Sequence, residues 1–517
     1  MAEIDGLGAL SAAQIALLAL YCVTVGLLSL YGFHRWFMLR LYCRHRRETP
    51  EPRGRFPQLP RVTVQLPIYN EYHVVDRLVD SIGALHYPKD RLEVQVLDDS
   101  TDETRGRAVA AVERLRGQGV DARYLHRDNR EGYKAGALAA GLSRTRSEFI
   151  FLLDADFVPP PDVLTKAIHH FTDDRIGMVQ MRWGHLNRRF SLLTRIQSIF
   201  LDGHLVIEHT ARNRSGRFFN FNGTAGLWRR QAIVDGGGWQ HDTLTEDLDL
   251  SFRAQLAGWR FLYLPDIEVP AELPVEINAF KTQQHRWTKG AVQTARKILP
   301  RVWRARLPLK VKVEATVHLT ANICYVLMLL MAVLMLPVLG IRQSMPWEHR
   351  LFLIDLPLFS MATMAIGSYY LVSQKALYED WKSSIKYLPL LMAIGISLCV
   401  NNARAVLEGL LGYRTGFQRT PKYGVGSGGS LPGAKYAGSK TLVALAELAM
   451  AGYFVLVISR AWEAQLYLGI PFLLLFHAGF LYTGTLSGLQ PWLGLAGLRW
   501  LGARTRDGRG LRSAAGA

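Results

Sequence analysis

Aspartates follow two short, β-branched runs of the sequence. Asp98 and Asp99 end one run, and Asp154 and Asp156 end another. Because residues two apart in an extended segment point to the same side, the carboxylates of Asp154 and Asp156 can converge on one point. At about 5 Å they repel by roughly 3 kcal/mol at an effective dielectric near 20, and a hard divalent cation removes that repulsion. The pattern predicts Mg²⁺ or Mn²⁺ with a diphosphate, although a lone Asp-x-Asp is more often a solvated turn or a helix cap.

Two further polar clusters occur later in the chain. Thr245, Glu246 and Asp247 follow a glycine-rich turn, and from their spacing alone we expect them to cap a helix that begins near residue 248. Arg286 lies beside Trp287. This pair suits either an anchor at a bilayer surface or a platform that binds a sugar ring and a phosphate.

The composition favours a membrane protein. Of 517 residues, 49% are hydrophobic and 20% charged, which argues against a disordered chain, and the apolar residues are gathered in runs. The formal charge of +18 would also suit a nucleic-acid binder, but the basic residues flank the apolar runs instead of lining a groove with aromatics. We therefore expect a lipid bilayer, and no nucleic acid, as a partner. Four cysteines without metal-type spacing exclude a disulfide scaffold or a zinc module.

Residues 60–310 have the pattern of a soluble α/β domain. Buried strands are predicted at residues 62–66, 92–97, 123–125, 149–153 and 177–181. Helical segments lie between them, one of them at 102–116 after a capping box formed by Ser100 and Glu103. This alternation predicts a mostly parallel sheet covered on both faces, with ligands at the carboxyl ends of its strands. The aspartate pairs lie at those ends.

Apolar runs of bilayer-spanning length flank this domain. Residues 10–30 form a predicted anchor, and the basic stretch 35–47 behind it predicts that the following chain is cytosolic. Four more spans are predicted, at 313–341, 351–372, 441–458 and 465–482.

A further apolar stretch, residues 387–411, is treated separately. It contains Asn401, Asn402, Arg404 and Glu408, which are costly in lipid unless they face protein or water. The basic tract that follows, 413–440, should be cytosolic, and a full span at 387–411 would place it outside. We therefore predict an interfacial or re-entrant segment and five spans, with six as the alternative. Asn401, Asn402 and Arg404 are polar candidates for lining a path through the bundle.

Motifs that occur in a fixed order carry a family resemblance: Asp98-Asp99, Asp154-x-Asp156, Thr245-Glu246-Asp247 and Gln283-x-x-Arg286-Trp287. Together they resemble the signature of membrane-integrated family-two glycosyltransferases, the group of cellulose, chitin and hyaluronan synthases. The runs at 65–71, 95–102, 132–137, 221–226 and 283–287 are similar to those of the plant cellulose-synthase-like A (glucomannan/mannan synthase) group. The resemblance covers about residues 61–299, and residues 417–422 resemble the gating loop of cellulose synthases.

The resemblance implies a fold and a division of the chain. The fold would be an α/β GT-A (Rossmann-like) catalytic domain, cytosolic and inserted in an α-helical transmembrane bundle. Residues 1–34 would be the anchor, 35–60 a basic juxtamembrane linker and 61–300 the catalytic domain. Residues 301–490 would form transmembrane and interfacial helices with a gating-type loop at 413–440, and 491–517 a basic tail. The membrane would be the inner or plasma membrane, or the Golgi in a eukaryote.

The resemblance also implies residues that hold the donor. The nucleotide sugar would be bordered by Tyr69, Glu71, Asp98, Asp99, Lys134 and Asp154. The metal and diphosphate would be bound by Asp154 and Asp156, with Mg²⁺ or Mn²⁺ as the cofactor.

On the acceptor side, the resemblance implies that Asp247 is the general base and that Glu246 supports it. An ordinary aspartate pKa near 3.9 would keep this base ionised at neutral pH. The acceptor end and the departing diphosphate would be held by Gln283, Arg286 and Trp287.

The implied activity is that of an inverting, processive β-glycosyltransferase. It would use GDP-mannose, GDP-glucose or UDP-glucose to elongate a β-1,4-linked mannan, glucomannan or glucan and move this β-glycan across the membrane. One alternative is a non-processive transferase acting on a membrane lipid such as ceramide or diacylglycerol. Another is a membrane receptor or transporter with a degenerate domain, against which the intact Asp247 and Arg286 argue.

Overall fold

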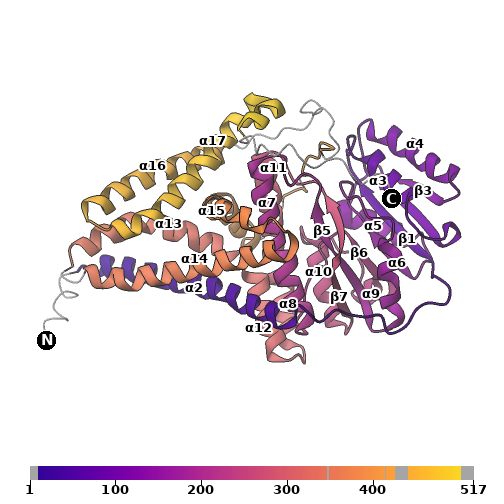
Figure 1. The fold of residues 1–517 in the computed structure, drawn as a ribbon, viewed down its shortest axis with the longest axis horizontal. Coiled ribbons are helices and arrows are strands. Elements are labelled where there is room, and N and C mark those ends of the chain that lie inside the picture. The colour runs from indigo at the N-terminus through magenta and orange to yellow at the C-terminus, as the bar shows by residue number, and fades with distance from the viewer. Residues whose placement is uncertain (1–9, 346–347, 414, 418, 426–440, 502–517) are drawn as a thin grey trace.

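The computed structural model describes residues 10–345, 348–413, 415–417, 419–425 and 441–501. Within them the chain forms an α/β domain and a bundle of long helices that lie side by side (Figure 1). Helix α2 (Ala12–His45) runs along the bundle before the chain enters the α/β domain. Helices α11 (Ile277–Arg304) and α12 (Leu309–Thr320) lead the chain back to the bundle.

A seven-stranded sheet forms the centre of the α/β domain, in the order β3-β2-β1-β4-β6-β5-β7. Its strands are β1 (Val62–Ile68), β2 (Leu92–Asp98), β3 (Asp121–His126), β4 (Phe149–Leu152), β5 (Ile176–His185), β6 (Gly226–Arg229) and β7 (Arg260–Ala271). Strand β6 pairs antiparallel with β4 and β5, and the other neighbours are parallel. The predicted α/β domain with a mostly parallel sheet is confirmed, and all five predicted strands are present.

Two strands were not predicted from the sequence. Strand β6 is only four residues long. Strand β7 contains Pro265, Asp266, Glu268 and Pro270, residue types that are depleted in strands. Both strands depend on tertiary pairing with β5, which local sequence patterns do not reveal.

Helices cover both faces of the sheet, as the alternating pattern predicts. On one face α3 (Val75–Gly83), α4 (Thr104–Gly117) and α6 (Val163–Ile168) bury aliphatic side chains against the strands. On the other face α5 (Tyr133–Leu142), α9 (Arg230–Asp235) and α10 (Glu246–Leu256) pack around Trp228 and Tyr263. The two cores fix the sheet and thereby the strand ends that carry the polar motifs.

The predicted capping box before α4 is wrong. The helix begins at Thr104, and Glu103 at its N-cap makes no side-chain capping bond. The Ser100 hydroxyl instead accepts a hydrogen bond of 2.8 Å from the backbone N–H of Asn70, in the turn after β1. The serine therefore joins the ends of two neighbouring strands, and Asp102 takes the N–H of Thr104.

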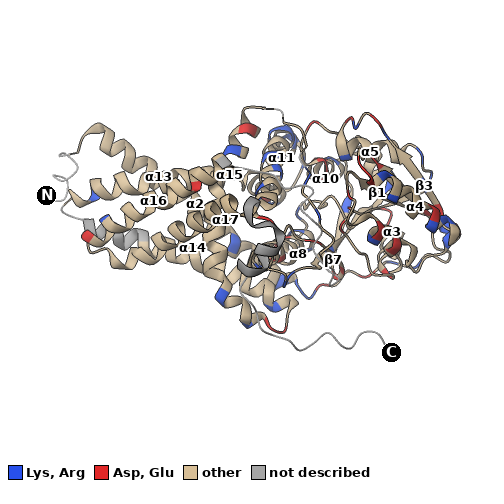
Figure 2. Cartoon of the chain, turned by 90° about the horizontal axis from the view of Figure 1, so that it is seen from above, with Lys and Arg blue, Asp and Glu red and all other residues tan. Residues whose placement is uncertain are grey.

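The bundle contains six helices that are long and apolar enough to cross a membrane, by length and composition alone. They include α2, α13 (Ile323–Gln343), α14 (Glu348–Leu377), α15 (Leu388–Leu410), α16 (Thr441–Glu463) and α17 (Ile470–Leu501). Figure 2 shows that acidic and basic residues are sparse along these helices and frequent in the α/β domain. These features indicate a multi-pass membrane protein.

Helix α15 is the segment that the sequence analysis set apart. It is one uninterrupted helix. In its most apolar stretch 61% of the residues are buried in the protein, against 17–39% in the other five candidate spans. The length criterion thus supports the six-span alternative to the predicted five. The helix is unbroken and largely covered by protein. Its interfacial or re-entrant placement stays a prediction.

Helix α11 lies between the sheet and the bundle (Figure 1). It crosses residue 300, where the sequence analysis divided the catalytic domain from the membrane segments, and that division stays a prediction. The remaining helices are α7 (Leu192–Asp202), a π-helical turn (Gly203–Glu208), α8 (His209–Arg214) and 3₁₀ segments at Lys89–Arg91, His169–Thr172, Trp381–Tyr387 and Tyr467–Gly469.

Candidate active site

A cleft of about 190 Å³ opens at the carboxyl ends of β1, β2 and β4. Its walls come from the α/β domain, from α11 and from residues 417–422, which lie between α15 and α16 in the chain. The sequence-predicted residues that line it are Tyr69, Glu71, Asp99, Lys134, Asp154, Asp156, Glu246, Asp247, Gln283, Arg286 and Trp287. Asp98 does not line it. The roles of all these residues stay predictions.

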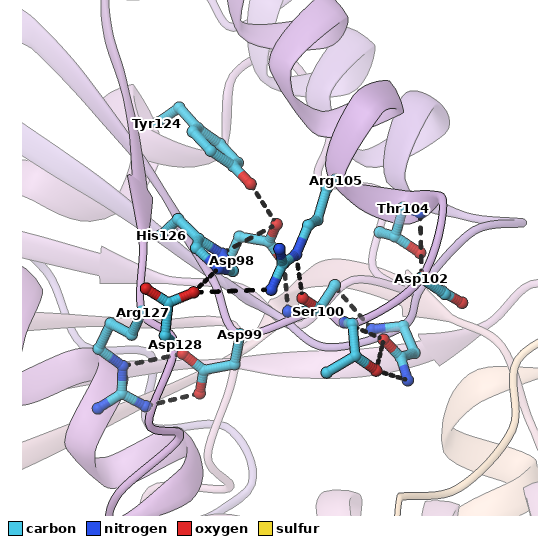
Figure 3. Close-up of polar contacts among 12 residues, drawn as sticks. Asp98, Asp99, Ser100, Asp102, Thr104, Arg105, Tyr124, His126, Arg127 and Asp128 are labelled. Carbon is cyan, nitrogen blue, oxygen red and sulfur yellow. Dashed lines mark hydrogen bonds and ion pairs between the residues drawn. The ribbon is translucent and has the colours of Figure 1, made fainter.

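Asp98 is fully buried at the end of β2. One carboxylate oxygen accepts a 2.6 Å hydrogen bond from the Tyr124 hydroxyl, and the other accepts one of 2.8 Å from the backbone N–H of Ser100 (Figure 3). Both oxygens are therefore used to shape the strand end. Asp98 supports the cleft from behind, and its neighbour Asp99 faces it.

Asp99 forms a two-point ion pair with Arg127, at 2.8 Å and 2.6 Å (Figure 3). The same guanidinium donates to the backbone carbonyls of Glu131 and Tyr133 and so fixes the loop that precedes α5. Such two-point pairs are geometrically specific as well as strong. Asp99 thereby orients the start of the helix whose second residue is Lys134.

Arg130, in that loop, was not predicted as a site residue. Its backbone has a φ of 44°, in the left-handed region, and its guanidinium lies 3.4 Å from the centre of the Tyr69 ring. Tyr133, also with positive φ, stacks on Phe417 with ring centres 5.8 Å apart. Positive φ in non-glycine residues costs energy and is often found at functional sites. That strain marks Arg130, which lies outside the motif at 132–137 that contains Tyr133.

Asp154 and Asp156 each pair with a lysine. The Lys134 ammonium donates to Asp154 at 2.5 Å and to the carbonyl of Gly223 at 2.9 Å. Burial raises the pKa of Asp154, but Lys134 and the more distant Lys422 outweigh it and hold the pKa below the ordinary value. Lys422 donates to Asp156 at 2.5 Å. Burial, together with the charge of Asp154, nevertheless keeps the pKa of Asp156 above the ordinary value.

These two carboxylates fit a divalent cation. They are hard oxygen ligands at one strand end, and Mg²⁺ usually takes one or two carboxylates together with phosphate oxygens. Among the residues that the structure describes, no group of three or more His, Cys, Asp or Glu side chains could hold a metal. A cation at Asp154 and Asp156 would therefore complete its shell with a diphosphate and water, and would compete with the two lysines.

Asp247 lies in the first turn of α10, which begins at Glu246, two residues before the expected start. Thr245 is the N-cap residue, as predicted, but its side chain makes no capping hydrogen bond. One of its oxygens accepts the backbone N–H of Leu248 at 2.8 Å. Burial, and then the neighbouring charge of Glu246, raise the pKa of Asp247 to about 7. The ordinary value expected from sequence is thus wrong, because the cleft removes water and adds a like charge.

Gly223 has a left-handed φ of 80°, and a Cβ there would lie 2.9 Å from the other carboxylate oxygen of Asp247. The glycine therefore keeps open the space beside this carboxylate.

Gln283, Arg286 and Trp287 line the cleft from α11. The Arg286 guanidinium lies 4.4 Å from the centre of the Phe417 ring. Burial lowers the pKa of Arg286, while Glu246, Asp154 and Asp247 act in the opposite direction. Arginine remains charged under such conditions, so this cation faces the carboxylates of the metal motif and of α10.

Helix α11 can approach α10 closely because residue 290 is glycine. A Cβ at Gly290 would lie 2.5 Å from the side chain of Thr245.

Phe417 and residues 419–422, from the segment that follows α15 in the chain, also line the cleft. Arg419 forms a two-point ion pair with Glu71 at 2.9 Å and 2.6 Å, and Lys422 lies 3.8 Å from the same carboxylate. Two residues of the predicted gating-type loop thus occupy carboxylates that the sequence assigned to the nucleotide and the metal. Sequence spacing cannot reveal such pairs, because Arg419 and Glu71 are 348 residues apart and Lys422 and Asp156 are 266 apart.

Chemically, the cleft combines three functions. Paired carboxylates can hold a cation, cationic side chains can stabilise an anionic leaving group, and Asp247 has a pKa near neutrality that suits a general base. In the described residues, the cleft lining contains no cysteine or serine that would serve as a covalent nucleophile.

Comparison with known proteins shows what the chain is similar to. Residues 60–290 match the family model described as "Glycosyltransferase like family 2". The chain is 44% identical over 250 residues to glucomannan 4-beta-mannosyltransferase 2 of Arabidopsis thaliana, which covers 47% of each protein. It is 41% identical over 268 residues to glucomannan 4-beta-mannosyltransferase 1 of Oryza sativa subsp. japonica, which covers 51% of each. The chain spans about half the length of the curated relatives it matches.

Among solved structures, the chain is similar to the mannosyltransferase PcManGT from Pyrobaculum calidifontis, in complex with GDP-Man and Mn²⁺. The identity is 20%, the TM-score is 0.49, and the match covers 77% of this chain and 98% of that one. The resemblance to family-two glycosyltransferases and to the glucomannan synthases, inferred from the motifs, is confirmed.

Replacement of Asp247 by Asn should stabilise the protein at high pH. The folded pKa of about 7 exceeds the unfolded value near 3.9, so ionisation of Asp247 destabilises the folded state fully above pH 7 and not at all below about pH 4. Asp247→Asn should therefore raise Tm by roughly a few degrees at pH 8, and this gain should shrink as the pH falls to 5. Thermal unfolding in detergent at both pH values measures it.

Asp174, whose side chain is 97% exposed, provides the control. Asp174→Asn should leave Tm unchanged at both pH values. A pH-independent effect of Asp247→Asn would contradict the raised pKa.

Replacement of Lys422 by Met should strengthen metal binding in the absence of donor. The ammonium on Asp156 competes with a cation for the same oxygen, so its removal should lower the Kd for Mn²⁺ by about tenfold or more. Titration of free Mn²⁺ by electron paramagnetic resonance measures this affinity. The exposed Lys382→Met should have no effect, and unchanged Mn²⁺ affinity in Lys422→Met would show that Lys422 does not compete for the site.

Proposed function

We propose that this chain, whose residues 60–290 are a glycosyltransferase family 2 domain, is an inverting, metal-dependent, processive β-glycosyltransferase. It would elongate a β-1,4-linked mannan or glucomannan from a nucleotide sugar and move the product across the membrane. One observation carries the proposal: a single cleft brings together Asp247, the Asp154–Asp156 pair and the α11 residues Arg286 and Trp287.

The relatives support the choice of sugar. Those with 41–44% identity are named glucomannan 4-beta-mannosyltransferases. GDP-mannose is accordingly the preferred donor, with GDP-glucose and UDP-glucose as the other candidates. The acceptor is the non-reducing end of the growing β-glycan.

The proposed reaction is a direct displacement. The oxygen of the acceptor hydroxyl attacks the anomeric carbon from the face opposite the diphosphate, and Asp247 accepts the proton of that hydroxyl. An α-linked donor therefore gives a β-glycoside. Arg286 and Lys134 stabilise the negative charge that develops on the departing diphosphate. A divalent cation held by Asp154 and Asp156 would neutralise part of the same charge. Trp287 would support a sugar ring of the acceptor.

The bundle supports the transport step. A cavity of about 500 Å³ lies between α2, α13, α14, α15 and α17. Its lining along α13 extends from Cys324 to Arg342, a rise of about 27 Å at 1.5 Å per residue, close to the 30 Å core of a bilayer. Tyrosine, phenylalanine and methionine side chains form much of the wall. We infer that this cavity is the path of the polymer, and that the α/β domain faces the cytosol, where nucleotide sugars are supplied.

The polar candidates from the sequence do not line this cavity. Asn401 donates to the backbone carbonyl of Lys281 at 2.9 Å, and Arg404 donates to Glu408 at 2.8 Å. With Asn402 they lie in α15 outside the described cavity lining, so the proposed path does not use them. Asn401 instead joins α15 to α11.

The decisive experiment offers each donor to the purified full chain in liposomes with Mn²⁺ or Mg²⁺. We expect GDP release and an insoluble, β-mannanase-sensitive product from GDP-mannose, and none from Asp247→Asn. With excess acceptor, kcat/KM should fall about tenfold per pH unit below pH 7, because Asp247 must be ionised to accept a proton. Radiolabel found only in an organic-soluble lipid would favour the non-processive glycolipid alternative over polymer synthesis. No turnover with any donor would refute the proposal.

Filling the cavity should shorten the product. Gly395 lines the cavity, and a Cβ there would lie 3.4 Å from Phe200, so a leucine should fit while obstructing the path. Gly395→Leu should shift the product from long polymer to short oligosaccharides with little change in the initial rate of diphosphate release. Gly452→Leu, at an exposed position of α16 with open space, is the matched control. Unchanged chain lengths in Gly395→Leu, by size-exclusion chromatography, would exclude this cavity as the path.

A further inference from the structure

A fully buried lysine follows the Gln-x-x-Arg-Trp motif by two residues. The Lys289 side chain has no exposed surface, and it is not among the described residues that line the cleft. Its ammonium donates to Glu408 of α15 at 3.0 Å and to the Thr415 hydroxyl at 2.9 Å. Burial of a lysine is costly unless it is paired and hydrogen-bonded, so its position requires both partners. Nothing in the proposed reaction uses it.

The partner Glu408 connects several side chains at the end of α15. It also accepts a hydrogen bond from Arg404 at 2.8 Å, and His285 of α11 lies 3.4 Å away. The backbones of the two helices come close here, since a Cβ on Gly409 would lie 3.1 Å from the carbonyl oxygen of Lys289. Lys289 can therefore reach Glu408 directly across the contact between α11 and α15.

The second partner, Thr415, lies two residues before Phe417. Phe417 contacts the Arg286 guanidinium and stacks on Tyr133, and Arg419 beyond it pairs with Glu71. Lys289 of α11 thus binds Thr415, and Phe417, two residues further along the chain, contacts Arg286 of the same helix. The start of the segment that closes the cleft is tied to the helix that carries the acceptor motif.

We propose that Lys289 is a positioning residue that holds Thr415 against α11 and thereby places Phe417 and Arg419 over the donor side of the cleft. Its kinetic consequence rests on the proposed function. Without the ammonium, Thr415 is no longer hydrogen-bonded to α11, and Phe417 and Arg419 are held less firmly at the cleft. Donor binding therefore weakens, while the groups that act on the anomeric carbon stay in place. The effect falls on the KM for the donor and much less on kcat.

The same helix contains a control for a merely structural role. Lys281 is also fully buried in α11, where it donates to Glu447 at 2.5 Å and to Ser487 at 2.6 Å. Its hydrogen bonds, within the described part of the chain, go to α16 and α17 and not to residues 413–425. Loss of Lys281 should destabilise the protein without releasing the segment that covers the cleft.

The first test does not depend on sugar transfer. Trypsin cleaves after Arg419 and Lys422, and its rate at these sites, followed by mass spectrometry of the full chain in detergent, reports how firmly the segment is held. Lys289→Met and Thr415→Val should each speed cleavage about tenfold, as expected for loss of one hydrogen bond to a charged group. Lys289→Arg should restore slow cleavage, and Lys281→Met should lower Tm without speeding cleavage.

The second test is kinetic. In Lys289→Met and in the milder Thr415→Val, the KM for GDP-mannose should rise about tenfold with kcat within a factor of about two. Cleavage no faster in these variants than in Lys281→Met, or an equal loss of kcat in all three, would overturn the assignment. If the wild-type chain transfers no sugar, the proposed function fails, whereas the proteolysis result still decides whether Lys289 holds the segment.

Discussion

Crowding of carboxylates at one edge of the sheet is the constraint on which the site depends. Glu71, Asp154 and Asp156 all face one cleft, and Asp247 lies opposite with its pKa raised by burial and by a like charge. Each of the three carboxylates on the sheet side pairs with a cation, since unpaired charges in such a cleft would lose their hydration without compensation. Among the described residues Asp247 forms no ion pair, and burial together with the charge of Glu246 keeps its pKa near 7, so it can take up a proton.

The compensating cations come from distant parts of the chain. Lys134 lies at the start of α5, Arg286 belongs to α11, and Arg419 and Lys422 follow α15. The α/β domain alone therefore supplies the acidic half of the cleft and only part of the basic half. In the proposed function the metal would replace the contact of Lys422 with Asp156, while Arg286 and Arg419 would remain on the donor side of the cleft. The balance of charge thus links occupancy of the cleft to the position of residues 417–422.

The sequence predicted those features that depend on local pattern. Buried β-branched runs revealed five strands, and the aspartate pairs could be placed at one edge of the sheet because they lie at strand ends. Arg286 and Trp287 lie inside a long helix and were assigned to the site only through the family resemblance. It did not reveal that Asp98 turns inward to Tyr124, since that depends on a tyrosine of the neighbouring strand. The strained Arg130 and Tyr133, the pairing of Lys422 with Asp156 and the raised pKa of Asp247 likewise arise from tertiary contacts. The hydrogen bond from Asn401 to the backbone of α11 is a further tertiary contact that the sequence pattern does not reveal.

Helix α11 shows why the catalytic and membrane parts form one structural unit. Its cleft side presents Arg286 and Trp287, while Lys281 and Lys289 are buried only because Glu447 and Glu408 of the bundle pair with them. Removal of the bundle would leave two lysines without carboxylates and expose the apolar contacts around them, and the helix would lose the neighbours that define its position. The amino-acid composition changes near residue 300, from that of a soluble domain to that of membrane helices, but α11 continues across this position. The parts before and after residue 300 therefore depend on each other for their stability. In the proposed function, the acceptor end would therefore be held by a helix whose position depends on the bundle.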